Sequence, residues 1–375
     1  MLGPFNGREM THDLFLLEVS MVMMSRRLVR GLALGAVLGA SAMASQAVSF
    51  CVFDIVGTSG DAFNMSRDYA VAMQREGVNI ELKVYTNEAK AVEDFRAGRC
   101  DAVIATGFRT RPFNGVAASV DALGSSIIVR NGVIDMTSSY DVMRKLVQTF
   151  AADRPQVTQL MTDASGKYEV GGILPVGAAY LVGSDRRYNT VEKLAGKRMA
   201  ALDYDPAQAV MIKRIKAIPV PSDITNISQR LSSGAADFIA APALAYKPLG
   251  LDKGVGERGG VARFPLMIMS YQVILDRNKF PEGFGARSRV YWLGQFDRVL
   301  QLIRKAESDI PAATWVELSP ENTYRYTLML REARIDIAQM GLYDKRGLKI
   351  LKRIRCHVNP ADPECKSKSE EEWPK

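Results

Sequence analysis

Residues 95–101, with the sequence FRAGRCD, and residues 231–237, with the sequence LSSGAAD, follow one plan and decide the fold. Each segment begins at the end of a helical pattern, passes through a glycine and two further residues to an aspartate, and leads into an apolar, strand-like run. Gly98 and Gly234 suit helix C-termini, because glycine readily adopts the left-handed conformation required there. A unit that occurs twice, and not many times, indicates two similar α/β halves.

Alternating strand and helix patterns surround both copies of this unit. The first half is expected to contain strands at residues 48–56, 78–85 and 100–105 and helices at 61–76 and 88–97. The second half is expected to contain strands at residues 197–202, 218–221 and 238–240 and helices at 206–215 and 223–231. Asn87 and Ser222 are suited to capping two of these helices. A β-α-β-α-β order predicts a parallel sheet covered by helices in each half.

Two long apolar segments, residues 168–183 and 261–276, are each long enough to cross between the halves, which predicts a hinge. The later patterns predict helices that brace both halves, at residues 288–307, 321–340 and 344–355. The charged residues 366–375 are expected to be disordered. The predicted fold class is therefore α/β, with two parallel-sheet lobes joined by a hinge and followed by C-terminal helices. The expected domains are a leader at 1–47, lobe 1 at 48–170, lobe 2 at 171–262, the return crossing and helices at 263–355, and a disulfide loop and tail at 356–375.

The beginning of the chain has the pattern of a secretory signal peptide, at about residues 23–47. Basic residues at 25–30 precede an apolar run at 31–43 and small residues at 44–47. The apolar run is shorter than the ~20 residues that span a bilayer, which disfavours the alternative of a membrane anchor. Acidic residues within 1–22 are unusual before a signal and indicate that the true start lies at Met21, Met23 or Met24. The expected product is periplasmic, with no stable membrane insertion after cleavage.

The four cysteines, Cys51, Cys100, Cys356 and Cys365, all follow the leader, where an oxidising compartment favours disulfides. Three pairings are possible. Two prolines between Cys356 and Cys365 favour a tight reversal and the pairing of these two residues, which leaves Cys51 to pair with Cys100. The alternative of a metal site at Cys356, His357 and Cys365 lacks a fourth good ligand.

The composition disfavours several classes of function. Only two histidines, His12 and His357, are present, which limits histidine-based catalysis and multi-histidine metal sites. P-loop and metalloprotease motifs are absent from the sequence. The net charge of +8 is spread along the chain, which disfavours nucleic acid as a partner. We therefore expect no enzymatic activity, no metal and no cofactor; an exported enzyme using the carboxylates of Asp54 or Asp203 is the alternative.

Ligand contacts are expected beyond the carboxyl ends of the strands in both lobes, where open α/β sheets bind their ligands. Turns there offer backbone and hydroxyl donors, arginines suit a carboxylate, an aspartate suits an ammonium group, and tyrosine rings suit an apolar body or a cation. The predicted partner is a small polar or zwitterionic solute. The predicted ligand-binding residues are Gly57, Thr58, Ser59, Thr106, Arg109, Arg111, Asp203, Tyr204, Tyr246 and Tyr271.

Simpler interpretations of the charged residues stay open. Arg109 and Arg111 are also compatible with solvated loop positions. Asp205 precedes a proline and is well placed to cap a helix. The opposite charges of the two lobes are equally compatible with a latch that joins arginine to aspartate without a charged ligand. Asp54 lies in an apolar strand and needs a partner if it is buried.

Residues 190–199 (TVEKLAGKRM) and 94–101 (DFRAGRCD) resemble the TRAP-type, or DctP-like, periplasmic solute-binding proteins of tripartite ATP-independent transporters. The resemblance covers nearly all of the chain after the leader and implies a periplasmic-binding-protein-like type II fold. In that family an arginine shortly after the Leu-x-Gly-Lys sequence clamps the ligand carboxylate. Here that place falls near Ala200, and Arg198 lies two residues earlier, so the usual organic-acid ligand is in doubt.

The chain also resembles a less described solute-binding family, some members of which have been labelled components of RND efflux systems. Both resemblances imply a receptor that captures a solute by hinge closure and delivers it to an inner-membrane transporter. An accessory component of an efflux assembly is the alternative function, and an exported enzyme on the same scaffold is a further one.

Overall fold

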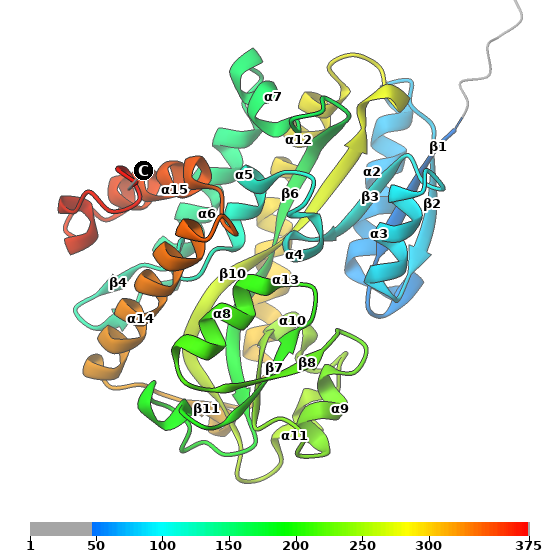
Figure 1. The fold of residues 1–375 in the computed structure, drawn as a ribbon. Helices are drawn as coiled ribbons and strands as arrows, with labels where there is room; N and C mark the ends of the chain where they lie inside the picture. Colours follow the sequence, from blue (N-terminus) through cyan, green and yellow to red (C-terminus); the bar gives the residue numbers. More distant parts are fainter. Residues whose placement is uncertain (1–46, 374–375) are drawn as a thin grey trace, which may run out of the picture. The chain divides into compact units, whose positions relative to one another are not determined.

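The computed structural model describes residues 47–373, so the predicted signal peptide and start site lie almost entirely outside the described residues. Nine strands of this region form one mixed sheet in the order β2-β1-β3-β10-β6-β9-β7-β8, with β11 beside β10, and β4 pairs with β5 separately (Figure 1). The strands are β1 (Val48–Phe53), β2 (Ile80–Tyr85), β3 (Ala102–Thr106), β4 (Val129–Arg130), β5 (Val133–Ile134), β6 (Tyr168–Gly183), β7 (Arg198–Leu202), β8 (Ile218–Ser222), β9 (Phe238–Pro242), β10 (Gly260–Asp276) and β11 (Trp315–Val316).

The helices begin and end largely where local chemistry predicts. They are α2 (Asp61–Arg75), α3 (Glu88–Arg96), α4 (Gly107–Thr110), α5 (Gly115–Ala118), α6 (Met136–Ala151), α7 (Pro155–Met161), α8 (Pro206–Arg214), α9 (Ile227–Ser232), α10 (Ala243–Tyr246), α11 (Leu251–Val255), α12 (Phe284–Gly294), α13 (Phe296–Ser308), α14 (Pro320–Gln339) and α15 (Lys345–Val358). The Asn87 side chain caps α3 by accepting a hydrogen bond from the Lys90 amide at 3.0 Å, which confirms that prediction.

Two helix predictions are wrong in detail. Ser222 caps no helix, because Asp223 accepts hydrogen bonds from the amides of Thr225 and Asn226 and holds a turn, so that α9 begins only at Ile227. The single helix expected at residues 288–307 is two helices, α12 and α13, which meet at Gln295 directly after Gly294. Glycine is a poor helix former, and a break beside it is physically reasonable.

The two halves repeat the same strand arrangement. In the first lobe, β1 lies between β2 and β3 and pairs with both in parallel, and β7 lies in the same way between β8 and β9 in the second lobe. The repeated aspartates make matching junctions: Asp101 accepts a hydrogen bond from the Ser49 amide at 2.8 Å, and Asp237 accepts one from the Arg198 amide at 2.7 Å. Gly98 precedes the first junction with a φ of 71°. The sequence repeat is therefore a repeat of structure.

The long strands β6 and β10 run antiparallel through both lobes, and they join the lobes into one hydrogen-bonded sheet. On the sides that face away from each other, β10 pairs with β3 of the first lobe and β6 pairs with β9 of the second. Their mutual register shifts between Pro265 and Met267 and again between Met269 and Ser270. Pro175 and Pro265 donate no backbone hydrogen bond. Further shifts lie between Val261 and Pro265 and between Val273 and Ile274, so the irregular pairing extends along both strands and includes the stretch that passes from one lobe to the other.

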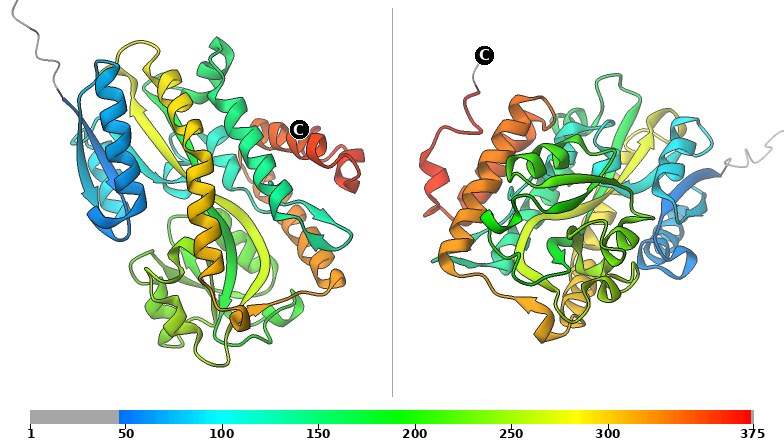
Figure 2. Two further views of the ribbon diagram at one scale, coloured as in Figure 1. Left: turned by 180° about the vertical axis from the view of Figure 1, so that it is seen from behind. Right: turned by 60° about the horizontal axis from the view of Figure 1, so that its bottom comes forward.

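Helices α12 and α13 run along the back of the crossing strands, as the view from behind shows (Figure 2). They approach closely because β6 carries glycines: a Cβ atom on Gly172 would collide with the Trp292 ring of α12, and one on Gly177 would lie 3.3 Å from Ile303 of α13. Helix α14 contacts α8 of the second lobe, and α15 contacts α5 and α6. The C-terminal helices thus contact elements along the length of the fold.

Both predicted disulfides are present, Cys51–Cys100 with a Cα–Cα distance of 5.8 Å and Cys356–Cys365 with one of 5.5 Å. The charged tail differs from the expectation of disorder. Glu370 is 1% exposed and forms ion pairs with Arg334 at 2.7 Å and Arg355 at 2.9 Å. Buried arginines need anionic partners, and Glu370 of the tail is such a partner for both Arg334 and Arg355.

Among the described residues, no helix has both the length and the apolar character needed to cross a membrane.

Candidate functional site

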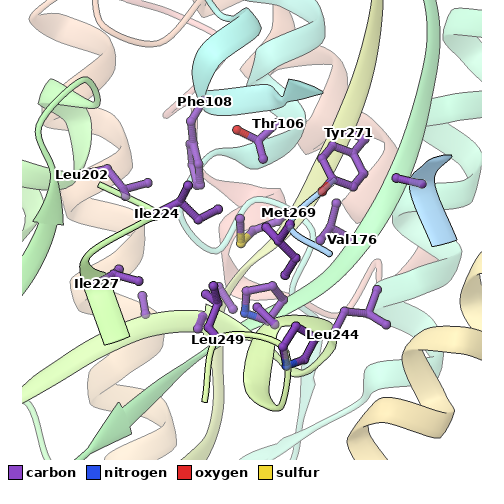
Figure 3. A pocket seen from close by; sticks show the side chains of 18 of the residues that line it. Thr106, Phe108, Val176, Leu202, Ile224, Ile227, Leu244, Leu249, Met269 and Tyr271 are labelled. Carbon is purple, nitrogen blue, oxygen red and sulfur yellow. The ribbon is translucent and has the colours of Figure 1, made fainter. Parts of the chain in front are cut away.

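A cavity of about 160 Å³ lies between the two lobes and against the crossing strands (Figure 3). The ends of β1 and β3 reach it from the first lobe, and the ends of β7 and β9 reach it from the second. It therefore occupies the place where the carboxyl ends of parallel strands predict a ligand site. The lining residues are Asp54, Ile55, Val56, Asp61, Ala62, Thr106, Phe108, Val176, Ala179, Leu202, Gln208, Ile224, Ile227, Ala240, Ala241, Pro242, Leu244, Ala245, Pro248, Leu249, Met267, Met269 and Tyr271.

Most of this lining is apolar, and the crossing strand β10 shows why. Alternate residues of a strand share a face, so Met267, Met269 and Tyr271 all face the cavity. Ser270 and Gln272 lie on the opposite face, where both are fully buried and the Gln272 amide donates to the Ser270 hydroxyl at 3.3 Å. The polar residues of the crossing strand therefore stabilise the interior, and its apolar residues form the cavity wall.

Two of the polar lining residues already hold the backbone in place. Asp54 is buried and accepts hydrogen bonds from the amides of Val56 at 3.0 Å and Phe63 at 3.1 Å, which caps the start of α2. Burial raises the pKa of Asp54, although these amides offset part of the effect. Gln208 accepts a hydrogen bond from the Leu202 amide at 2.5 Å. Asp54 thus has the partners that its burial requires.

Tyr271 is different, because its hydroxyl points into the cavity without a partner (Figure 3). Within residues 47–373 no hydrogen bond reaches this hydroxyl, and the side chain is half-buried. Burial, followed by the charges of Glu88 and Asp54, raises the pKa of Tyr271 well above its ordinary value. The hydroxyl therefore stays protonated and neutral, and it is free to donate or accept one hydrogen bond.

Of the ten predicted ligand-binding residues, Thr106 and Tyr271 line the cavity and the others do not. Gly57 is buried with a φ of 71°, and Thr58 and Ser59 are exposed on the same turn. Asp203 is exposed after β7, and Tyr246 is buried within the second lobe.

Arg109, Arg111 and Tyr204 instead join the lobes to each other. Arg111 donates to the Asp205 carboxylate at 2.8 Å, and Asp205 also caps α8. The Arg109 guanidinium lies over the Tyr204 ring, 3.2 Å from its centroid, and the Tyr204 hydroxyl donates to Glu88 at 3.2 Å. We call these five residues the interlobe latch. It corresponds to the latch interpretation of the opposite charges, with Asp205 as the acidic partner.

The carboxylate clamp expected from the TRAP resemblance has no counterpart in the cavity. Arg198 lies at the amino end of β7 and pairs with Asp237 at 2.8 Å, while Ala200 is fully buried and does not line the cavity. Among the residues that the structure describes, no arginine, lysine or histidine lines the cavity.

The main part of the lining was missed from the sequence, because apolar residues at strand ends look like ordinary core. The alternation of Met267, Met269 and Tyr271 was the one signal that could have located a wall of the cavity. Phe108, which follows β3, lines the cavity as well.

The family described as "Solute-binding protein AdeT 1/2" matches residues 70–370. The chain belongs to this AdeT 1/2 family. It is 36% identical over 314 residues to the probable solute-binding protein AdeT1 of Acinetobacter baumannii, covering 84% of this chain and 98% of the relative. The probable solute-binding protein AdeT2 of the same organism is 28% identical over 198 residues, covering 53% and 83% of the two chains.

Solved structures place this AdeT 1/2 member within a known fold. A TRAP periplasmic solute-binding protein from Ralstonia eutropha, solved with bound (S)-2-acetolactate, superposes with a TM-score of 0.63 at 12% identity, covering 84% of this chain and 98% of that one. The periplasmic ectoine-binding protein of a Halomonas elongata TRAP transporter also gives a TM-score of 0.63 at 12% identity, covering 84% and 100%. The chain therefore has the two-lobed type II fold of periplasmic binding proteins. Its membership of the AdeT 1/2 family makes it a solute-binding protein.

Proposed function

We propose that this protein is a periplasmic receptor that captures a small solute in the cavity between its lobes and delivers it to a transporter in the inner membrane. The observation that carries the proposal is the place of the cavity. Both lobes and both crossing strands contribute to its wall, so a solute bound there contacts both lobes at once. Such contacts are complete only while the lobes are closed, and binding therefore favours the closed form.

The latch and the hinge support the same proposal. Contacts such as Arg111 with Asp205 form only when the lobes meet, and the irregular pairing of β6 with β10 lies beside the cavity. The relatives are named solute-binding proteins, and several structural neighbours hold small bound solutes. Their fold and family favour a role in periplasmic capture and not in catalysis.

A thermal-shift screen tests the proposal: a library of solutes is added to the protein that lacks the predicted leader, and the melting temperature is measured with each solute. A bound solute raises the melting temperature, since it binds only the folded form. Met269→Trp fills the cavity, and we expect it to abolish the shift of any solute found (Figure 3). The matched control is Val290→Trp on α12, a position that is 53% exposed, which should keep the full shift.

Retention of the shift by Met269→Trp would place the binding site elsewhere and refute the proposal. Small-angle scattering provides a second readout, because closure around a solute should reduce the radius of gyration of the wild-type protein but not that of Met269→Trp.

A further inference from the structure

We infer that the solute has an apolar body of roughly six to ten non-hydrogen atoms and one polar group that is neutral or positively charged, and that carboxylate solutes are rejected. This inference deepens the proposed function and rests on it. It restricts the class of solute expected from the sequence, which was polar or zwitterionic. It also excludes the organic acids that a clamping arginine would bind.

The size of the solute follows from the cavity. Its volume is about 160 Å³. An engineered apolar cavity of about 150 Å³ in another protein holds one benzene molecule. The side chains that face the centre of this cavity, such as Ile224, Leu244 and Met269, are apolar (Figure 3). A body that replaces water against this surface gains free energy in proportion to the apolar area that it buries.

The charge of the solute follows from the titratable groups around the cavity. Asp54 and Asp61 line it, and Glu88 lies close enough to influence the pKa of Tyr271. The two arginines predicted to bind the ligand, Arg109 and Arg111, do not line the cavity and are engaged with Tyr204 and Asp205 in the latch. An anion entering the cavity would therefore lose its hydration without gaining an opposite charge, which is strongly unfavourable.

The polar group of the solute has one evident partner. Tyr271 presents a neutral, unpartnered hydroxyl to the cavity, whereas Asp54 and Gln208 already accept backbone hydrogen bonds. Within the described part of the chain the Thr106 hydroxyl also lacks a hydrogen-bond partner, but it is fully enclosed, so Tyr271 offers the accessible group. A hydroxyl or amine on the solute would satisfy Tyr271, which would otherwise be dehydrated without compensation when an apolar body fills the cavity. The arrangement thus selects a solute that is apolar over most of its surface and polar at one end.

Three probes of nearly equal size test the inference: benzyl alcohol, benzylamine and benzoate. We expect benzyl alcohol and benzylamine to bind at least tenfold more tightly than benzoate at pH 7, measured by isothermal titration calorimetry or ligand-observed NMR. Benzoate binding should strengthen as the pH falls, because the neutral acid is then the species that enters.

Tyr271→Phe removes only the hydroxyl, so it should weaken the binding of benzyl alcohol severalfold while leaving the affinity for toluene unchanged. Equal or tighter binding of benzoate at pH 7 would overturn the inference, and so would a library in which only carboxylates bind; the proposed function would survive both results. If Met269→Trp, which fills the cavity, weakens the binding of none of the three probes and of no library solute, the proposed function fails together with the inference.

Discussion

The ion pair between Arg111 and Asp205 predicts a strong energetic coupling between the two lobes. The nitrogen and oxygen atoms lie 2.8 Å apart, and the side chains are only 15% and 4% exposed. Burial disfavours the charged guanidinium, but the surrounding acidic groups, Asp205 foremost, outweigh this effect and hold the pKa of Arg111 above its ordinary value. Arg111→Met removes the charge and keeps an apolar stem. Asp205→Asn removes the other charge, and asparagine remains a good cap for α8.

The expected magnitudes follow from burial. Removing one partner of a buried ion pair leaves an uncompensated charge and costs about 3–5 kcal/mol. Since Asp205→Asn keeps the cap and Arg111 retains slight solvent access, we expect each single variant to lower the free energy of unfolding by about 2–4 kcal/mol. The double variant should cost little more than either one, which corresponds to a coupling energy of about 2–3 kcal/mol.

Chemical denaturation of the wild type, the two single variants and the double variant measures this coupling. The matched control is the ion pair of Arg298 with Asp68, which has a similar distance of 2.6 Å but side chains that are 49% and 53% exposed. Its coupling should stay below about 1 kcal/mol and should weaken in high salt, to which a buried pair is less sensitive. A coupling at Arg111–Asp205 no larger than that of the control would refute the argument that this contact holds the lobes together.

Two further predictions concern other buried charges. Burial raises the pKa of Asp121 from 3.8 to about 8, so between these values the native state holds a proton that the unfolded state has lost. The free energy of unfolding should therefore fall as the pH rises from 4 to 8, and Asp121→Asn should make this fall smaller. Denaturation at several pH values measures this, and an equal fall of the unfolding free energy in both proteins would contradict the prediction. Glu370→Gln should lower the free energy of unfolding by about 3 kcal/mol, because it breaks a buried ion pair with Arg334, whereas Glu372→Gln, at a side chain that is 67% exposed, should change it by less than about 0.5 kcal/mol. The same denaturation assay decides this, and equal effects of the two variants would show that the tail contributes no buried charge.

The fold was largely predictable because it depends on short-range patterns. Residues 168–183, an apolar run with no helical period, form one strand with the expected bounds. The junctions at Gly98–Asp101 and Gly234–Asp237 require a left-handed glycine and a carboxylate at fixed spacing, and both copies carry them. Local hydrogen bonds of this kind are visible in a sequence because their partners are near neighbours or follow a repeat.

The candidate site was predictable only in its location. The carboxyl ends of the strands do meet at the cavity, but the chemistry of its wall depends on which side chains the lobes bring together. Arg111 and Asp205 are 94 residues apart, and no local pattern shows that they lie within hydrogen-bond distance. The same limit explains Glu370, since a highly charged tail is typical of disorder unless buried arginines elsewhere in the chain bind it.

The latch and the cavity have a common physical cause. The charged residues of the two lobes lie just beyond the ends of strands that face each other. Closing the lobes therefore brings opposite charges together without the help of a ligand. Arg111 meets Asp205, and Arg109 lies over Tyr204 beside Glu88. These contacts satisfy the charges at the seam and leave the apolar ends of the strands to enclose the cavity. Under the proposed function, closure would be stabilised by charges that do not line the cavity, and the choice of solute would depend on apolar shape and on the Tyr271 hydroxyl. In this arrangement, variants of the latch should change the affinity for all solutes by a similar factor, whereas variants of the cavity wall should change the order of preference among them.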